Sequence, residues 1–261
     1  MATTLNLCNL PSWVLASRDY NDHPTPLVIQ GATSADRQFF ARLDAADDPE
    51  QRAELFEDYM TVKFYLDQWS NVSEGAKKSI RNSYVRFIRG WGIDSNAPEA
   101  AVLKAWVESR FGIAPTFHKV RLSAQHGTDY SPYELDRTRG IARTNSIYGQ
   151  FDLVYAYCQY ELIRQHSEAT WLTLYRGTYG AEEHEILERD SRRSYSVRLN
   201  NLCSFTSEME HAWEFGTTVW SVRVPRSKVF FFGDLLPRIQ LKGENEYMVI
   251  GGEYRVEEIW G

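Results

Sequence analysis

The first half of the chain carries apolar residues at the spacing of an α-helix. Three sets recur every three or four residues: Leu55, Tyr59, Val62 and Leu66; Ile80, Tyr84, Phe87 and Ile88; and Leu103, Trp106, Val107 and Phe111. Such spacing places each set on one face of a helix. Gly90 and Gly112 follow the second and third sets, and glycine commonly ends a helix. The pattern predicts three amphipathic helices, the second of which ends at Gly90.

The middle of the chain is more polar. A stretch that contains glycine and proline, SAQHGTDYSPYELDRTRG, runs from Ser123 to Gly140. Because such residues interrupt regular elements, the stretch predicts an ordered long loop or a junction between subregions. Helical spacing then returns and predicts one more helix, with these apolar residues: Ile147, Phe151, Val154, Tyr155, Cys158 and Leu162.

Beyond residue 170 the chain consists of short segments rich in aromatic and β-branched residues, most of them bounded by Gly, Pro or polar turns. These segments are 171–177, 194–200, 217–225, 228–232, 246–252 and 253–260. Their composition and length predict strands. Because regular helices do not alternate with these strands, we predict an α+β fold rather than a doubly wound parallel sheet.

Composition and charge narrow the classes of partner. The 261 residues are 43% hydrophobic and 14% aromatic, enough for the core of one large domain or two small ones. A net charge of −6 argues against wholesale binding of nucleic acid or of an anionic membrane. Clustered positive residues such as Arg189, Arg192 and Arg193 can still meet a phosphate locally.

The cysteines and the apolar runs predict a cytoplasmic protein. Cys8, Cys158 and Cys203 are odd in number and lack CxxC spacing, so neither a disulfide framework nor a structural zinc site is predicted. No apolar run reaches the roughly 18 residues of a membrane span, and the N-terminus lacks a basic region followed by an apolar segment.

Common cofactor signatures are missing from the sequence. There is no GxGxxG and no GxxxxGK[ST], which argues against a Rossmann dehydrogenase and a P-loop ATPase. The six histidines show no HxxxH or HxH pairing, so no metal is predicted.

Two glutamates stand at the start of an apolar run in the stretch LKGENEYMVIGG. If a strand includes both, its period of two places Glu244 and Glu246 on one face. Partial burial of two like charges requires a cation, a sugar hydroxyl or a shared proton. The alternative is a solvated turn that enters an edge strand.

Two further positions carry candidate chemistry. Arg176 ends the strand LTLYRG on the same face as Leu172 and Leu174, where it needs a partner or an anionic ligand unless it reaches solvent past the sheet edge. The adjacent Gly177 permits close approach of a ligand to the backbone, or serves a turn.

Ser207 lies in the stretch CSFTSEMEHAWEFG. With Glu210 three residues later it forms a predicted capping box that opens a short helix. Such a turn also presents a hydroxyl and backbone N–H groups to a ligand, so capping and binding are compatible.

The order LYRG, then SFTSE followed by AWEFG, then KGENEYMVIGG resembles the Arg, Ser-Thr-Ser and Glu-x-Glu signature of mono-ADP-ribosyltransferases. Nearly the whole chain, from NLCNLPSWVLASRDYNDHP through NSYVRFIRGWGIDSN to FFFGDLLPRIQLKGENEYMVIGG, is similar to the NAD-dependent dinitrogenase reductase ADP-ribosyltransferases of nitrogen-fixing bacteria. One departure concerns the serines, because only the first serine of Ser-Thr-Ser is matched. Ser204 and Ser207 both remain candidates for it, and the preceding Phe205 favours Ser207.

The resemblance implies one catalytic unit. Residues 1–140 would form a mainly helical portion, and residues 141–261 an NAD-binding core of two small packed β-sheets. The implied reaction moves ADP-ribose from NAD to an arginine of dinitrogenase reductase and inactivates that protein. It also implies regulation by a PII-type signalling protein.

The resemblance and the chemistry together suggest a role for each candidate. Glu246 would stabilise the oxocarbenium character of the ribose, and Glu244 would take a proton from the incoming guanidinium. Arg176 would bind the phosphates or the adjacent ribose of NAD beside Gly177, and Ser207 would orient the glutamate or the nicotinamide ribose.

The loop 233–241, which contains Leu235, Leu236 and Arg238, would read the target protein, unless its leucines pack against the core. Two other functions stay open. One is an NAD glycohydrolase or another glycosidase, in which water replaces arginine. The other is a noncatalytic binding protein whose glutamate pair is a solvated edge.

Overall fold

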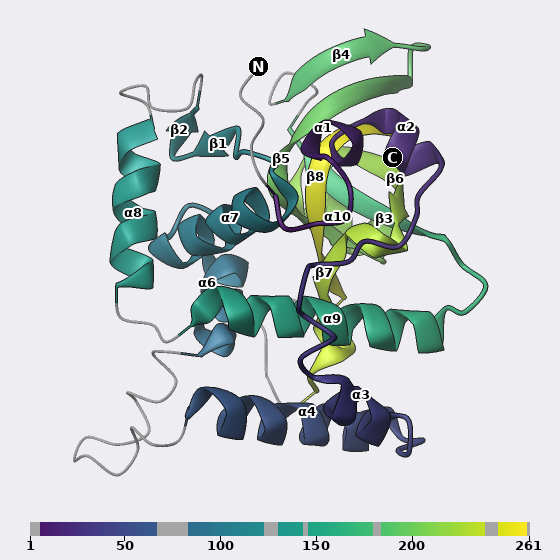
Figure 1. The fold of residues 1–261 in the computed structure, drawn as a ribbon. Helices are drawn as coiled ribbons and strands as arrows, with labels where there is room; N and C mark the ends of the chain where they lie inside the picture. Colours follow the sequence, from purple (N-terminus) through teal and green to yellow (C-terminus); the bar gives the residue numbers. More distant parts are fainter. Residues whose placement is uncertain are drawn as a thin grey trace.

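The computed structural model describes residues 6–66, 83–122, 130–142, 146–179, 184–237 and 245–259. Helices and a curved sheet lie side by side, with α6, α7 and α8 on one side of the sheet and α9 crossing beneath it (Figure 1). The N-terminal segment returns to the sheet through α1 and α2, where the backbone N–H of Glu253 donates to the carbonyl of Ala16 at 2.7 Å.

Helices dominate the first part of the chain. They are α1 (Ser12–Leu15), α2 (Arg18–Asp22), α3 (Arg37–Leu43), α4 (Pro49–Phe64), α6 (Tyr84–Ile93), α7 (Pro98–Phe111), α8 (Ser131–Ile141) and α9 (Ile147–Gln165), with the short strands β1 (Phe117–His118) and β2 (Val120–Arg121) before α8. The predicted helices correspond to α4, α6, α7 and α9, and Ile80 lies outside the described residues. The helical N-terminal portion is therefore confirmed.

The predicted end of the second helix is wrong, because α6 continues through Gly90 to Ile93. A Cβ added at Gly90 would lie 2.7 Å from Cβ of Glu99, so the glycine allows the start of α7 to approach α6 closely. Gly112 does end α7, in the left-handed conformation with φ of 70°.

The predicted loop 123–140 is also wrong in its second half, which forms α8. Pro132 lies in the first turn of the helix, where the missing N–H has no intrahelical partner to lose. Gly140 permits close packing on α7, since an added Cβ would lie 2.4 Å from Cγ2 of Val102. The proline and glycine that suggested a loop are a helix start and a helix–helix contact.

Strands dominate the second part. They are β3 (Trp171–Thr178), β4 (Glu185–Arg189), β5 (Ser194–Thr206), β6 (Thr218–Pro225), β7 (Val229–Phe232) and β8 (Glu246–Ile259). Short helices separate some of them: α10 (Met209–Ala212), η4 (Trp213–Phe215), η5 (Arg226–Lys228) and η6 (Gly233–Leu235). The sheet is antiparallel with the order β4-β5-β3-β6-β8-β7, and β5 also pairs with β8. The α+β prediction is confirmed.

The two sheets expected from the resemblance are joined into one hydrogen-bonded sheet of six strands. Strands β5 and β8, of 13 and 14 residues, pair with each other along most of their length. One half of β8 also pairs with β7 and the other half with β6. The sheet curls until Tyr175 of β3 pairs with Thr206 at the end of β5.

The segments 246–252 and 253–260 were predicted as two strands, but they form the single strand β8. Gly251 and Gly252 do not make a turn between them. A Cβ added at Gly251 would lie 1.7 Å from the carbonyl oxygen of Asn200, beside the irregularity in β5 between Leu199 and Leu202. Gly251 therefore accommodates a bulge in the neighbouring strand, whereas Gly252 accommodates the close approach of Ala16.

Helices and sheet share one hydrophobic core. Trp106 of α7 lies 4.6 Å from Phe230 of β7 between ring centroids, and both side chains are fully buried. On the far side of α9, the rings of Phe56 and Tyr157 stack at 4.2 Å. No helix in the described part of the chain is long and apolar enough to span a bilayer.

A buried ion pair joins α4 to α9. Nε and Nη2 of Arg52 donate to the two carboxylate oxygens of Glu161 at 2.6 and 2.8 Å, and the side chains are only 3% and 2% exposed. Arg52 Nη1 also donates to the carbonyls of Ala46 and Asp47.

We expect Arg52→Met to lower the free energy of unfolding by about 3–5 kcal/mol, because it leaves the Glu161 carboxylate buried without a counterion. Urea unfolding followed by circular dichroism measures the change. The double variant Arg52→Met/Glu161→Leu should recover most of the loss. A loss below about 1 kcal/mol in the single variant would contradict the buried pair.

Candidate active site

Glu246 is the first residue of β8 and lies opposite Thr206 of β5. Because alternate residues of a strand share a face, Ser204 lies diagonally across from Glu246 on the same face. Oγ of Ser204 donates to Oε1 of Glu246 at 2.7 Å, and the indole Nε1 of Trp91 on α6 donates to that same Oγ at 2.8 Å. Strand β5 thus holds this carboxylate directly through Ser204, and helix α6 holds Ser204.

Burial is the main influence on the Glu246 carboxyl and raises its pKa above the ordinary value. The hydrogen bond from Ser204, the nearby indole N–H of Trp91 and the charge of His211 lower the pKa and so act in the opposite direction. The Glu246 carboxylate is therefore partly desolvated, and the hydrogen bond that it accepts favours its negatively charged form.

Arg176 lies on β3 next to Ser204, the residue that donates to the Glu246 carboxylate. Its Nη1 donates to the backbone carbonyl of Ser204 at 2.8 Å, while its Nε is buried and has no hydrogen-bond partner in the described structure. The sequence-based expectation that Arg176 needs a partner or a ligand is thus met only in part by Ser204. One buried N–H group of Arg176 is left without a hydrogen-bond partner among the described residues.

Gly177 is needed for packing between protein segments. A Cβ added there would lie 2.1 Å from the carbonyl oxygen of Ala212, so the glycine lets α10 and η4 approach β3. The close backbone approach expected at this position is therefore made by Ala212.

The capping box predicted from Ser207 and Glu210 is wrong. Helix α10 begins at Met209, its N-cap residue is Glu208, and the N–H of Glu208 donates to Oγ1 of Thr206 at 3.1 Å. Ser207 is exposed, and its backbone N–H donates to the carbonyl of Asn245 at 3.4 Å. Of the two candidate serines, Ser204 is the one bonded to Glu246, and Ser207 lies on the neighbouring turn.

Glu244 lies outside the described residues, but the geometry of its neighbour affects the argument for the glutamate pair. Asn245 has a φ of 65°, in the left-handed region, and β8 begins only after it. The alternation of faces therefore starts at Glu246, and the strand period does not place Glu244 on the same face.

The loop 233–241 is described as far as residue 237. Leu235 and Leu236 are 2% and 0% exposed, so the expectation of exposed leucines is wrong and their alternative, packing in the core, holds. Arg238 lies outside the described residues.

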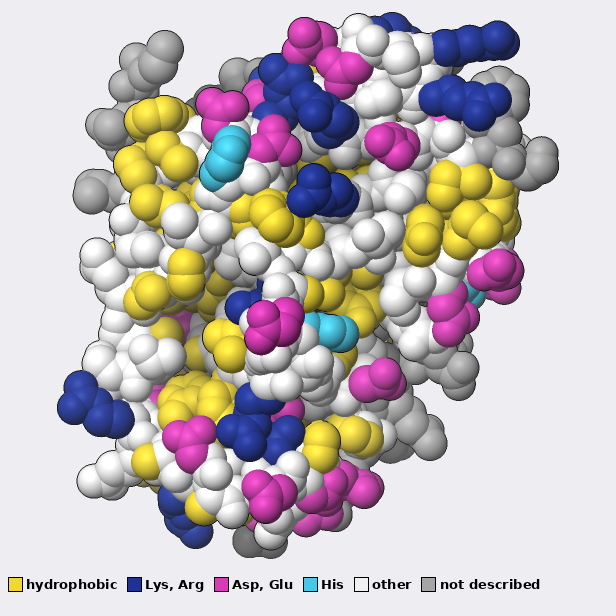
Figure 2. Space-filling model, turned by 90° about the vertical axis from the view of Figure 1, so that its right-hand side faces the viewer, with side chains coloured by type: hydrophobic (Ala, Val, Ile, Leu, Met, Phe, Trp, Pro, Cys, Tyr) yellow, Lys and Arg dark blue, Asp and Glu magenta, His cyan; other side chains and the backbone are white. Residues whose placement is uncertain are grey.

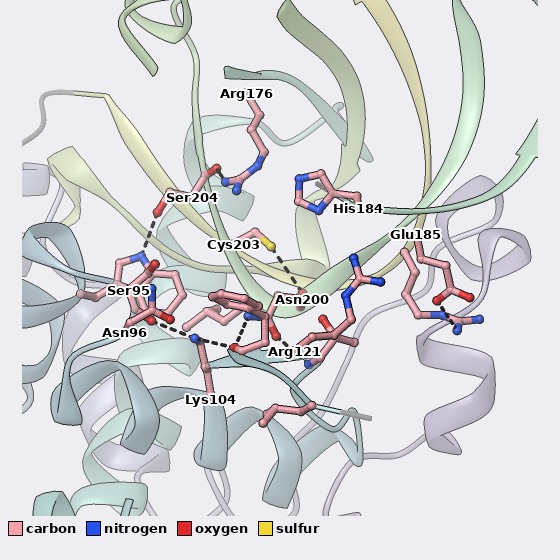
Figure 3. Close-up of a pocket in the computed structure, with 16 residues that line it drawn as sticks. Ser95, Asn96, Lys104, Arg121, Arg176, His184, Glu185, Asn200, Cys203 and Ser204 are labelled. Atoms are coloured by element: carbon pink, nitrogen blue, oxygen red, sulfur yellow. Dashed lines mark hydrogen bonds and ion pairs between the residues drawn. The ribbon is translucent and has the colours of Figure 1, made fainter. Parts of the chain in front are cut away.

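A cavity of about 730 Å³ opens beside Ser204 and Arg176. Figure 3 shows Arg176 and His184 entering it from the sheet and Lys104 entering from α7. Most of the charged residues in its lining are positive: Lys104, Arg121, Arg176 and Arg198. Among the described residues, the one acidic side chain of the lining is that of Glu185, which is paired with Arg198 at 2.8 Å.

Burial lowers the pKa of two side chains in the lining. Lys104 donates to the carbonyls of Ser95 and Phe117, and burial lowers its pKa to about 8, so it is still mainly charged at neutral pH. Burial and the nearby Arg176 and Arg121 lower the pKa of His184 to about 4, and its Nε2 is buried without a partner in the described structure. The positive side chains of Lys104, Arg121 and Arg176 in this lining favour an anionic ligand with hydrogen-bonding oxygens.

Sequence reasoning missed the residues that the helical portion contributes to this cavity, among them Trp91, Lys104 and Arg121. Their types and spacing carry no chemical motif. The only signal for Trp91 is its place in NSYVRFIRGWGIDSN, one of the stretches that carry the family resemblance.

Two further features concern metal binding by the described residues and the charge of one face of the molecule. Within the described ranges, no group of three or more His, Cys, Asp and Glu residues is positioned to hold a metal ion. On the face shown in Figure 2, basic and acidic side chains are interspersed among small apolar patches.

Comparisons with known proteins agree with the resemblance found in the sequence. The dinitrogenase reductase ADP-ribosyltransferase (DRAT) family model matches residues 5–258. A curated protein of Rhodospirillum rubrum, NAD(+)--dinitrogen-reductase ADP-D-ribosyltransferase, is 41% identical over 257 residues, which are 97% of this chain and 93% of that protein. No solved structure matches the chain significantly. Because the matches cover both the helical portion and the sheet, the chain belongs to the dinitrogenase reductase ADP-ribosyltransferase family.

Proposed function

We propose that this protein is a mono-ADP-ribosyltransferase that moves ADP-ribose from NAD to an arginine of dinitrogenase reductase and thereby inactivates it. Family membership supports the reaction. The structural observation that carries the proposal is the hydrogen bond from Ser204 to Glu246 at the edge of a positively charged cavity.

NAD fits the cavity in size and charge. A volume of about 730 Å³ lies within the usual range of roughly 300–1,000 Å³ for small-molecule sites. The pyrophosphate of NAD carries two negative charges, which suit the positive side chains of Arg176 and Arg121 in the lining. Gly177 supports this site by letting α10 pack against β3 next to Arg176.

Glu246 lowers the barrier for loss of nicotinamide. Cleavage of the N-glycosidic bond builds positive charge on the ribose, as in glycoside hydrolysis. A carboxylate that accepts a hydrogen bond from the ribose 2′-OH stabilises the ribose more strongly as this charge grows. It therefore lowers the free energy of the transition state more than that of bound NAD. The bond from Ser204 directs the carboxylate, while Ser207 contacts the nicotinamide ribose from the adjacent turn.

Glu244 serves the incoming arginine. A guanidinium has a pKa above about 12 and must lose a proton as its nitrogen attacks the ribose carbon. Glu244, two residues before Glu246, accepts that proton. The two glutamates therefore divide the reaction between the sugar and the nucleophile.

Family membership supports the acceptor, and the setting is part of the same proposal. An attached ADP-ribose is bulky and doubly negative, and it blocks docking of dinitrogenase reductase by its size and its charge. Because Leu235 and Leu236 are buried, target recognition falls to the part of the loop after residue 237. A PII-type signalling protein regulates the enzyme, which works in the reducing cytoplasm with its three cysteines as buried free thiols. The whole chain acts as one catalytic unit.

The test is transfer of labelled ADP-ribose from NAD to purified dinitrogenase reductase, with nicotinamide release followed in parallel. Wild type should do both, and Glu244→Gln should lose transfer while keeping some nicotinamide release. Nicotinamide release without transfer by wild type would indicate an NAD glycohydrolase. Neither reaction, together with an unchanged melting temperature at saturating NAD, would indicate a noncatalytic protein, because binding at 100 times Kd should stabilise the fold by about 2.7 kcal/mol.

We expect Arg176→Ala to raise the KM for NAD roughly tenfold to a hundredfold, the value of a hydrogen bond to a charged group. Steady-state kinetics of nicotinamide release measure the change. The control is Arg192→Ala, which removes an exposed arginine from the turn between β4 and β5 and should leave KM unchanged. Equal effects of the two changes would show that only the overall charge matters.

A further inference from the structure

Trp91 connects the helical portion to the candidate catalytic carboxylate. It lies on α6, is 4% exposed, and its indole N–H donates to Oγ of Ser204 at 2.8 Å. That Oγ in turn donates to Glu246 at 2.7 Å. Trp91 and Ser204 are 113 residues apart in the chain, so this connection exists only in the folded protein.

The direction of the two hydrogen bonds is fixed by chemistry. An indole N–H donates and never accepts, so the oxygen of Ser204 must be its acceptor. The serine proton is then left for a second oxygen, and the carboxylate of Glu246 is at the right distance to receive it. Bonds in such a chain polarise one another, so the bond from Trp91 strengthens the one that reaches Glu246.

The indole ring itself is held in place. The ammonium of Lys104 lies 5.9 Å from the centroid of the Trp91 ring and is anchored by the carbonyls of Ser95 and Phe117. The Trp91 ring is therefore held by Lys104 and is bonded to Ser204 through its N–H. This leaves the Ser204 hydroxyl little freedom to rotate away from Glu246.

We propose that Trp91 is a positioning residue for the reaction: its N–H fixes the Ser204 hydroxyl as a donor to Glu246 and so keeps that carboxylate aimed at the ribose. The inference rests on the proposed function of the same site. It makes the helical portion a working part of the catalytic apparatus in addition to a wall of the cavity.

The experiment uses the full chain and replaces Trp91 by phenylalanine, which keeps an aromatic ring and removes the N–H. We expect kcat for nicotinamide release to fall about tenfold to a hundredfold, with KM for NAD changed less than about twofold. The change acts through Ser204, so Trp91→Phe/Ser204→Ala should be no slower than Ser204→Ala alone.

The matched control is Trp106→Phe. Trp106 is also fully buried, lies on the neighbouring helix α7, and donates its N–H to Oδ1 of Asp152 at 2.8 Å, away from Glu246. The Trp106→Phe variant should lose stability as Trp91→Phe does, but its kcat should be unchanged. If Trp91→Phe does not fold, incorporation of 3-benzothienylalanine at position 91 keeps the bicyclic shape and removes only the N–H.

The possible outcomes distinguish this inference from the proposed function on which it rests. A fall in kcat with unchanged KM, absent from Trp106→Phe and not additive with Ser204→Ala, supports the inference. An unchanged kcat, or effects of Trp91 and Ser204 that multiply, would overturn it while wild-type activity keeps the proposed function. A wild type that releases no nicotinamide would overturn both.

Discussion

Glu246→Gln should abolish nicotinamide release and ADP-ribose transfer together, with kcat lower by about a thousandfold or more. The amide keeps the size of the side chain but loses the negative charge that opposes the growing positive charge on the ribose, and loss of one such electrostatic contact costs about 10²–10³ in rate even when it is a neutral donor. Parallel assays of labelled transfer and of free nicotinamide measure both reactions.

The same variant should be at least as stable as wild type. Burial raises the pKa of Glu246, so the folded state binds a proton more readily than the unfolded state and loses stability as the pH rises through that pKa. Glutamine removes this loss at neutral pH. Thermal unfolding checks it, and Glu257→Gln, an exposed position on the same strand, is the control that should leave both rate and melting temperature unchanged.

The raised pKa also determines the pH profile. The ionised carboxylate is the active form, so activity should increase with pH, with the midpoint above the value of about 4.3 that is usual for glutamate. A rate that stays constant down to that value, or near wild-type activity in Glu246→Gln, would exclude this carboxylate from the chemistry.

Ser204→Ala and Ser207→Ala should differ in which kinetic parameter changes. Ser204 donates to Glu246, so its removal should lower kcat about tenfold to a hundredfold at nearly constant KM for NAD. Ser207 is exposed on the turn next to Asn245, so its removal should mainly raise KM. The same nicotinamide assay separates kcat from KM for both variants.

Stability provides an independent check on the two serines. A helix cap at Ser207 would make Ser207→Ala less stable by roughly 1 kcal/mol. Because α10 begins after Glu208 and the turn uses Thr206 Oγ1, we expect a smaller loss. If Ser207→Ala instead lowers kcat and Ser204→Ala does not, the preference taken from the sequence is correct and the hydrogen bond to Glu246 is not used in catalysis.

The sequence by itself determined the main elements and the principal motif residues. Helical spacing located α4, α7 and α9, and β-branched and aromatic runs located most of the sheet, because burial of one helix face or of a strand leaves a periodic pattern in the chain itself. The order of motifs brought Arg176, the candidate serines and Glu246 to notice before any geometry. These signals are local, or they depend on order along the chain.

Tertiary structure decided what local patterns leave ambiguous. Glycine is a residue typical of turns. Gly90, Gly140 and Gly251 nevertheless lie inside helices or a strand, where another segment approaches too closely for a Cβ. Glycine serves both purposes, and only the packing partner distinguishes them. The α8 helix was missed for this reason.

The site depended on long-range pairing in the same way. Ser204 and Ser207 are equivalent by residue type, and the register between β5 and β8 selects Ser204 as the neighbour of Glu246. Trp91 carries no motif, and its N–H reaches that serine because α6 packs against the sheet. Register and packing arise from contacts between residues far apart in the chain, which is why they could be obtained only from the folded structure.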